Sequence, residues 1–388
     1  MRVRQQGLTI LTAALSLTIA AVPPSGIHAL EPGSDPGPTK RVRADQWHLT
    51  YLNVGEAQRI TRGAGVTVAV PDTGVQPHPD LRDNLLDGTD VISGGDGNGQ
   101  DDLNSHGTGM AGLIAAHGQG ENLGALGIAP EAKILPIRDT PGDGQGQPDD
   151  LAASIDYAVR HGANVICISS TGGAGITLQR SIEAALAADV VLVASVGNAP
   201  QDTVVGYPAS AHAVIAVGGI GRNGMHSAIS TTGPEVDVVA PAVDIYSTSI
   251  DGKYRKGTGT SDATAIVAGA AALIRSKYPH LPAQEVAHRL TATAVDKGPP
   301  GRDDEYGYGV IDLVAALTAD VPPLGFESVS APAGGGASTT AGARPGDDDG
   351  ATVRGLATLG VIVAAGVGWA LVLRRRRRGD DPPPRISR

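Results

Sequence analysis

Three residues far apart in this sequence, Asp72, His106 and Ser261, are of the types that together carry out nucleophilic catalysis. A serine hydroxyl is a weak nucleophile until a histidine takes its proton. A carboxylate can hold that histidine in the required tautomer and stabilise its charged form. Together the three side chains could attack a carbonyl carbon and form an acyl-enzyme.

The segments around these residues predict elements that could position them. The apolar, β-branched run 66–70 predicts a strand that ends close to Asp72, and His106 opens a run of small residues that predicts a helix. Ser261 follows a glycine-rich approach and begins an Ala-rich helix that continues to about Lys277. A serine in a first helical turn could simply cap the helix. The presence of all three segments favours a nucleophile at the positive end of the helix dipole.

The middle of the chain alternates between predicted strands and helices. Strands are expected at 133–137, 164–169, 190–195, 213–218 and 236–240, and helices at 149–161 and 178–188. This alternation predicts an α/β fold with right-handed βαβ units and a mostly parallel central sheet covered by helices on both faces. In such sheets functional residues lie at the carboxyl ends of strands, where Asp72 and Asn198 fall.

The three segments, in the order Asp, His, Ser, resemble the subtilisin-type (subtilase) serine peptidases over residues 44–320. The resemblance implies a subtilisin-like three-layer fold and hydrolysis of peptide bonds without a cofactor. It also implies that the Asn198 amide contributes to an oxyanion hole. Ser169, Ser170 and Gly172 then belong to a substrate-binding strand, to which a bound peptide adds as a further strand.

Four positions depart from the usual pattern of that family. Asp262 follows the serine where an uncharged residue is common, Gly109 replaces a frequent histidine, Ala265 replaces a common proline, and Pro71 precedes the aspartate. None of these changes removes a catalytic group. A carboxylate at position 262 is expected to raise the pKa of the histidine or to repel an oxyanion.

Composition excludes some classes of protein. The net charge of −10 argues against a nucleic-acid partner, which would need a basic face. The single cysteine, Cys167, rules out an intramolecular disulfide and lies in an apolar run, where a buried strand position is expected.

Oxygen-bearing side chains gather in the loop 94–102. Asp96, Asn98 and residues 100–102 could hold Ca²⁺, although an ordinary polar turn explains the same composition.

The C-terminal region predicts a membrane anchor. Residues 355–373 carry no charge and would span about 28 Å as a helix, close to the thickness of a bilayer core of about 30 Å. Five arginines follow directly and favour the cytoplasmic side. The expected topology is single-pass type I in the cell membrane, with the catalytic domain extracytoplasmic. The predicted divisions are a signal peptide (1–29), a leader (30–43), the peptidase domain (44–320), a disordered stalk (321–354), the transmembrane helix (355–373) and a basic tail (374–388).

This architecture resembles the mycosins, the membrane-anchored subtilases of type VII secretion systems, although mycosins typically carry disulfides. The resemblance implies a polypeptide substrate and partners in a membrane secretion complex. Two hypotheses follow: an active, tethered serine endopeptidase, or a weakly active or inert subtilase fold that serves as a structural partner of such a complex. A carbohydrate-active enzyme has no recognisable carboxylate pair here to support it.

Overall fold

A computed structural model describes residues 37–92 and 96–325. The expected signal peptide, transmembrane helix and basic tail, and residues 326–354 of the expected stalk, lie outside the described residues. None of the helices within the described ranges is both long and apolar enough to cross a bilayer.

A seven-stranded, entirely parallel sheet forms the centre of the described region. Its order is β2 (Thr89–Asp90), β3 (Lys133–Arg138), β1 (Thr67–Asp72), β4 (Val165–Ile168), β5 (Val191–Ser195), β6 (Ile215–Ile220) and β7 (Val238–Pro241). The strands are almost continuously apolar and buried, as expected when helices cover both faces. The predicted parallel sheet is confirmed.

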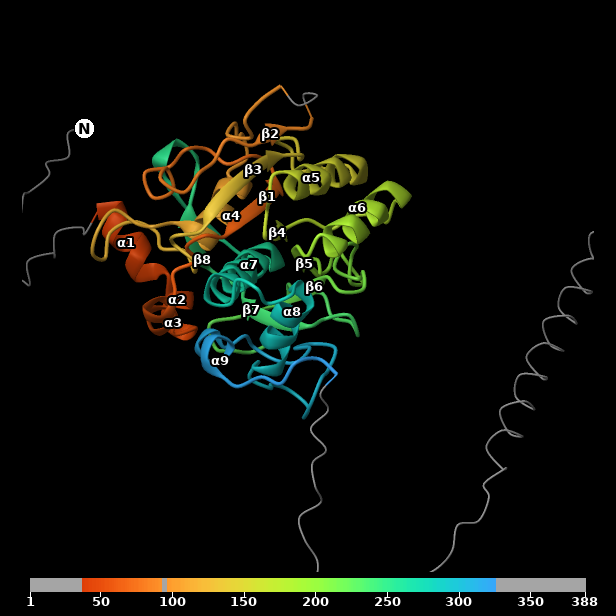
Figure 1. Ribbon diagram of the computed structural model, residues 1–388. Helices are drawn as coiled ribbons and strands as arrows, with labels where there is room; N and C mark the ends of the chain where they lie inside the picture. The colour runs from red at the N-terminus through yellow and green to blue at the C-terminus, as the bar shows by residue number, and fades with distance from the viewer. Residues whose placement is uncertain (1–36, 93–95, 326–388) are drawn as a thin grey trace, which may run out of the picture. The chain divides into compact units, whose positions relative to one another are not determined.

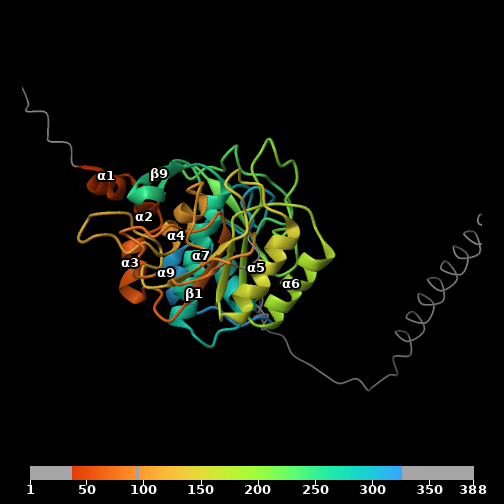
Figure 2. The same ribbon diagram turned by 90° about the horizontal axis from the view of Figure 1, so that it is seen from above.

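Helices lie on both sides of this sheet (Figures 1 and 2). One side carries α4 (His106–Ala115) and α7 (Thr260–Lys277), and the other carries α5 (Pro148–Arg160) and α6 (Ile176–Ala187). All but two residues of α7 are buried, and its alanines and glycine let it pack closely against β4, β5, β6 and β7. The helices α8 (Ala283–Ala292) and α9 (Leu313–Thr318) pack beside α7. The three-layer arrangement agrees with the predicted fold class.

A two-stranded antiparallel hairpin, which the sequence did not predict, connects the sheet to α7. It consists of β8 (Ile245–Thr248), the 3₁₀ turn η1 (Ile250–Gly252) and β9 (Tyr254–Gly257). The Ser247 hydroxyl donates to the carbonyl of Gly109 at 2.7 Å, and the Thr248 hydroxyl donates to the carbonyl of Thr108 at 2.6 Å. The hairpin is therefore fixed to the first turns of α4.

Three short helices precede the first strand: α1 (Gly37–Asp45), α2 (Trp47–Tyr51) and α3 (Val54–Ile60). The amide of Gln46 donates to the carbonyls of Leu126 and Tyr246 at 3.0 and 3.1 Å, and it accepts the N–H of Leu126. The Trp47 indole donates to Val243 at 3.0 Å. Thus α1 starts within the segment expected to be a leader. Together α1, α2 and α3 form a helical segment that these hydrogen bonds join to the rest of the described region.

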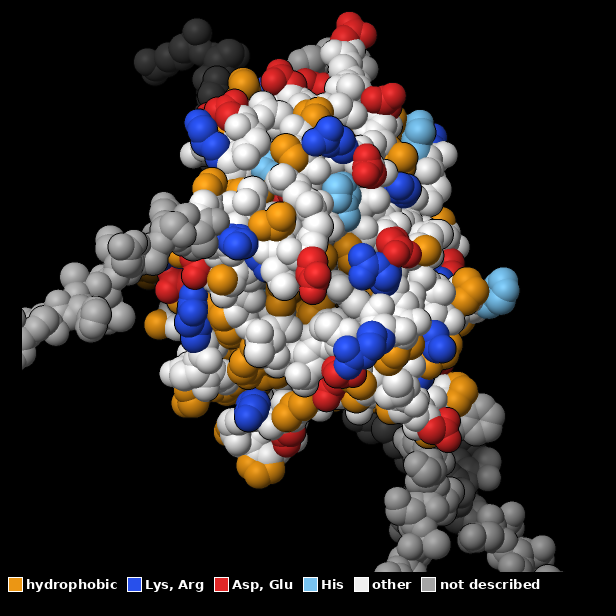
Figure 3. Space-filling model, turned by 90° about the vertical axis from the view of Figure 1, so that its left-hand side faces the viewer, with side chains coloured by type: hydrophobic (Ala, Val, Ile, Leu, Met, Phe, Trp, Pro, Cys, Tyr) orange, Lys and Arg blue, Asp and Glu red, His pale blue; other side chains and the backbone are white. Residues whose placement is uncertain are grey.

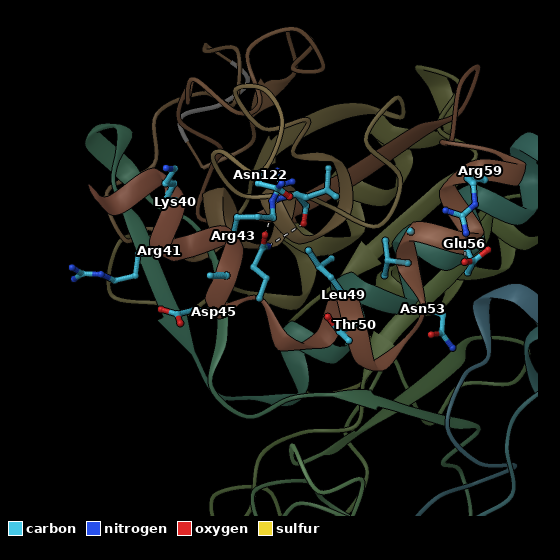
Figure 4. A pocket seen from close by; sticks show the side chains of 15 residues that line it. Lys40, Arg41, Arg43, Asp45, Leu49, Thr50, Asn53, Glu56, Arg59 and Asn122 are labelled. Atoms are coloured by element: carbon cyan, nitrogen blue, oxygen red, sulfur yellow. Dashed lines mark hydrogen bonds and ion pairs between the residues drawn. The ribbon is translucent and has the colours of Figure 1, made fainter. Parts of the chain in front are cut away.

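Helices α1 to α3 border a hollow together with Asn122 and Leu126. The hollow has a volume of about 970 Å³. Figure 4 shows the side chains that line it, among them Lys40, Arg43, Leu49 and Glu56. It shares no lining residue with the cleft at Asp72 and His106. Figure 3 views the side of the molecule that faces left in Figure 1, and basic and acidic side chains are interspersed over it.

Candidate active site

The structure brings Asp72 and His106 into direct contact. Asp72 is the last residue of β1 and is 5% exposed, while His106 is the first residue of α4. The imidazole Nδ1 lies 2.8 and 2.9 Å from the two carboxylate oxygens. Because Nδ1–H donates to the carboxylate, Nε2 is the nitrogen left to accept a proton.

Asp102, which sequence reasoning left in a polar loop, organises this contact. It is 1% exposed. Its oxygens accept hydrogen bonds from the backbone N–H groups of Asn104, Ser105 and Thr108 and from the hydroxyls of Thr73 and Thr108. The Thr73 hydroxyl in turn accepts the N–H of Gly107 at 3.1 Å. The network ties the end of β1 to the start of α4, and so fixes Asp72 relative to His106.

The backbone immediately before the histidine is strained. Ser105 has a φ of 79°, in the left-handed region that non-glycine residues rarely adopt. Its N–H is held by Asp102 at 2.9 Å. Strain of this kind is maintained only where the surroundings enforce it, which they do here.

Ser261 is the second residue of α7 and is 8% exposed. The helix begins after Gly259, so Ser261 lies inside the first turn and does not cap it. Its hydroxyl donates to the carbonyl of Ser169 at 2.8 Å. Within the described ranges it makes no hydrogen bond to His106.

Asn198 follows the carboxyl end of β5 and faces the start of α7. Its Oδ1 accepts the backbone N–H of Thr260 at 2.9 Å and the Thr260 hydroxyl at 3.2 Å. Its own backbone N–H donates to Asp202 at 2.7 Å. The side-chain Nδ2 has no hydrogen-bond partner among the residues described and is free to donate to a bound group.

A cleft of about 380 Å³ lies against Asp72, His106 and Asn198, and Ser261 is not among the residues that line it. Its lining includes Asp72, His106, Asn198, Ser169 and Ser170. The predicted substrate-binding residues lie beyond the carboxyl end of β4, where Ser169 is buried and Ser170 is exposed.

Gly172, the third predicted substrate-binding residue, lines an adjoining hollow of about 300 Å³. Its N–H pairs with the carbonyl of Tyr207 at 2.9 Å. In the described segments the backbone of Ser170 makes no hydrogen bond to other main chain.

The charge state of His106 depends on opposing effects. Burial of the ring lowers its pKa, but the charge and hydrogen bond of Asp72, with help from Asp262, outweigh burial and leave the pKa raised. Arg255 acts in the opposite direction and lowers it. The expectation that Asp262 favours the charged histidine agrees with this pattern.

Two further carboxyl groups near the site are buried. Burial raises the pKa of Asp262 to about 6, although the charges of Arg255 and His106 counteract it. Burial raises the pKa of Asp139, which directly follows β3, to about 8. The Asp139 N–H donates to the carbonyl of Asp72 at 3.0 Å, and its carboxyl accepts the Thr140 hydroxyl at 2.9 Å. Sequence reasoning did not identify Asp139.

Cys167 lies on β4 and is buried, as predicted. Burial raises the pKa of its thiol to about 12, which makes it a poor nucleophile.

Several polar groups of the loop considered for Ca²⁺ already have hydrogen-bond partners within the protein. Asn98 and Gln100 donate to the Asp87 carboxylate at 3.3 and 3.2 Å, and Asp102 serves the network above. In residues 37–92 and 96–325 no group of three or more His, Cys, Asp or Glu side chains could hold a metal ion.

Comparison with known proteins agrees with this geometry. Residues 63–309 match the model of the Subtilase family. The chain is 37% identical over 334 residues to Mycosin-1 of Mycobacterium tuberculosis, covering 71% of this chain and 74% of that protein. It is 39% identical over 261 residues to Subtilisin DY of Bacillus licheniformis, covering 66% of this chain and 92% of that protein.

Solved structures give the same result. The crystal structure of MycP1 with its N-terminal propeptide removed matches with a TM-score of 0.65 and 34% identity, over 71% of this chain and 98% of that one. MycP1 from Mycobacterium smegmatis matches with a TM-score of 0.64 and 32% identity, over 71% of this chain and 85% of that one. The chain therefore belongs to the subtilase family of serine endopeptidases.

Proposed function

We propose that this protein is a membrane-anchored, extracytoplasmic serine endopeptidase in which Asp72, His106 and Ser261 form the catalytic triad. The observation that carries the proposal is the Asp72–His106 contact at 2.8 Å, together with the bond from the Ser261 hydroxyl to the carbonyl of Ser169, a residue that lines the same cleft. In this mechanism Nε2 of His106 takes the proton of Ser261 as its oxygen attacks the peptide carbonyl. The same proton then passes to the leaving amine.

The hydroxyl of Ser261 must first turn away from the carbonyl of Ser169, to which it donates in the structure. This change fits the general behaviour of apo sites, which often tighten their catalytic hydrogen bonds only when substrate binds. The same observation favours the alternative, a weakly active or inert subtilase fold that serves a membrane complex structurally.

The developing oxyanion is stabilised by Nδ2 of Asn198 and by the backbone N–H of Ser261. Asn198 is held for this role because its Oδ1 is bonded to Thr260, which directs Nδ2 elsewhere. The substrate is a polypeptide that pairs with the backbone of Ser169, Ser170 and Gly172. The main chain of Ser170, unpaired among the described segments, supports strand addition beyond the end of β4.

The physiological setting we propose is a type VII secretion system. The support is the likeness to MycP1, which is described as an essential component of the type VII (ESX-1) secretion system. The apolar segment 355–373 supplies the proposed anchor. Partners would then be components of the membrane secretion complex.

Cleavage of unfolded casein by the purified full chain tests the peptidase proposal. We expect cleavage by the wild type and none above background for His106→Ala or Ser261→Ala, with unchanged thermal unfolding. Equal cleavage by wild type and variants would refute the assignment, and no cleavage by folded wild type would favour the structural alternative. Retention in membranes after alkaline carbonate extraction, and its loss on truncation before residue 355, tests the anchor.

A further inference from the structure

The side chain of Arg255 extends from the hairpin to the backbone at the start of α4, next to His106. Arg255, on β9, has its Nη1 3.5 Å from the carbonyl oxygens of Ser105 and His106. A Cβ at Gly109 would lie 2.7 Å from Cδ and 2.8 Å from Nη1 of Arg255, which is closer than such atoms can approach. The absence of a side chain at position 109 therefore gives Arg255 its place over the first turn of α4.

The carboxylate of Asp262, in the first turn of α7, lies near the same guanidinium. Asp262, the residue after the nucleophile, is 2% exposed. A Cβ at Gly257 would lie 2.6 and 2.7 Å from the two oxygens of Asp262 and 2.9 Å from Nη2 of Arg255. Both charged groups thus border the bare backbone of Gly257, the last residue of β9.

Two departures from the usual subtilase pattern are thereby explained together. Gly109 makes room for Arg255, and Arg255 supplies a positive charge near the buried Asp262. A buried carboxylate without a positive neighbour would be costly to ionise. The arrangement spans the hairpin strand β9 and the first turns of α4 and α7. Those two turns carry His106 and Ser261.

We propose that Arg255 and Asp262 are positioning residues of opposite charge, placed beside the first turns of α4 and α7, that together set the pH range over which His106 works as a base. The proposal rests on the triad assignment made above. Neither residue is assigned contact with substrate. They act through the backbone of His106 and through charge.

Arg255 and Asp262 should shift the pH dependence of activity in opposite directions. The charged groups that act on His106 are Asp72 on β1, Asp262 on α7 and Arg255 on β9. The negative charge of Asp262 raises the pKa of His106, and the positive charge of Arg255 lowers it. Since His106 must be neutral to accept a proton, removal of Arg255 should move the acid limb of activity to higher pH. Removal of Asp262 should move it to lower pH.

The rate of Ser261 labelling by a fluorophosphonate, measured on the full chain between about pH 5 and 9, tests this without knowledge of the natural substrate. We expect a higher-pH acid limb for Arg255→Gln, a lower-pH limb for Asp262→Asn, and a limb between the two for the double variant. The plateau rate of Arg255→Gln should fall roughly 10-fold, because misplacement of a catalytic group is costly. Limbs that do not move, or that move in the same direction, would overturn the proposal.

Lys256→Gln is the matched control for loss of a positive charge on the same strand. Lys256 pairs with Asp244 at the surface, so its removal should leave both the limb and the plateau unchanged. Failure of the wild type to label at all would instead count against the triad, so the two proposals fail in distinguishable ways.

Gly109→Ala provides an independent variant that alters neither charge. The added methyl group should displace the flexible end of Arg255 and shift the acid limb in the same direction as Arg255→Gln. In an Arg255→Ala background the same change should have little effect, because the side chain with which it collides is gone. Equal effects in both backgrounds would show that position 109 does not act through Arg255 and would overturn the proposal.

Discussion

Replacing Asn198 by alanine removes one donor from the proposed oxyanion hole and one acceptor from the start of α7. Loss of the equivalent donor in subtilisin costs about 10²–10³-fold in kcat, or about 2.7–4 kcal/mol of transition-state stabilisation. Loss of the acceptor leaves the buried N–H of Thr260 without its partner at 2.9 Å, which should lower the free energy of unfolding by about 1–3 kcal/mol. The alanine variant therefore mixes a catalytic and a structural effect.

Asn198→Asp separates these effects. A carboxylate retains an oxygen for Thr260 and replaces the Nδ2 donor with a second oxygen, which would repel an oxyanion. We expect the aspartate variant to unfold close to the wild-type temperature and yet to lose at least as much kcat as the alanine variant. Steady-state cleavage of a quenched fluorescent peptide, together with thermal unfolding, provides the assay. Wild-type kcat in either folded variant would refute the role of Asn198.

Three other variants test the role of Asp72 in catalysis and the effect of buried Asp139 and His48 on stability. Asp72→Asn should keep the fold but lower kcat about 10⁴-fold, because the imidazole would take the wrong tautomer, and a loss below about 10-fold would contradict the role of Asp72. Burial raises the pKa of Asp139 to about 8, so the folded state binds a proton that the unfolded state releases near pH 3.8. The free energy of unfolding should consequently fall as the pH rises from about 4 to 8, and in Asp139→Asn this decline should be smaller, as urea titrations would show. Burial lowers the pKa of His48 to about 3, and its ring nitrogens have no hydrogen-bond partner among the described residues. Wild-type stability should therefore be lost as the pH falls from about 6.5 toward 3, and calorimetry of His48→Leu should show a smaller loss.

Much of the fold could be predicted because the local signals agree with the tertiary structure. The apolar runs at 133–137 and 190–195 became β3 and β5 with ends shifted by no more than one residue. A strand buried on both faces has few alternatives when it is apolar throughout. The small residues after His106 likewise predicted α4, because only a helix that packs tightly needs so many of them.

The hairpin β8–β9 could not be predicted in the same way. Its second strand contains Arg255 and Lys256, and it is stabilised by hydrogen bonds from Ser247 and Thr248 to the distant helix α4. Such contacts leave no periodic pattern in the sequence.

The supporting residues of the site were missed for a related reason. Asp102 lies in a stretch of polar residues typical of a surface loop, and only the tertiary structure shows it buried against Thr73 and Thr108. Asp139 follows a strand, as Asp72 does, but nothing in the sequence shows that it is enclosed. The positions of Asp72, Asp102 and Asp139 in the sequence could have suggested that carboxylates gather near His106. They could not have shown which hydrogen bonds these carboxylates make.

The central claim is that Ser261 is a nucleophile activated by His106 and Asp72. The most direct measurement is intact-mass analysis of the folded full chain after reaction with a fluorophosphonate, followed by peptide mapping. We predict a single adduct on Ser261 that forms much more slowly in His106→Ala and is absent from Ser261→Ala. Folded wild-type protein that gains no adduct, or an adduct that persists in Ser261→Ala, would contradict the claim.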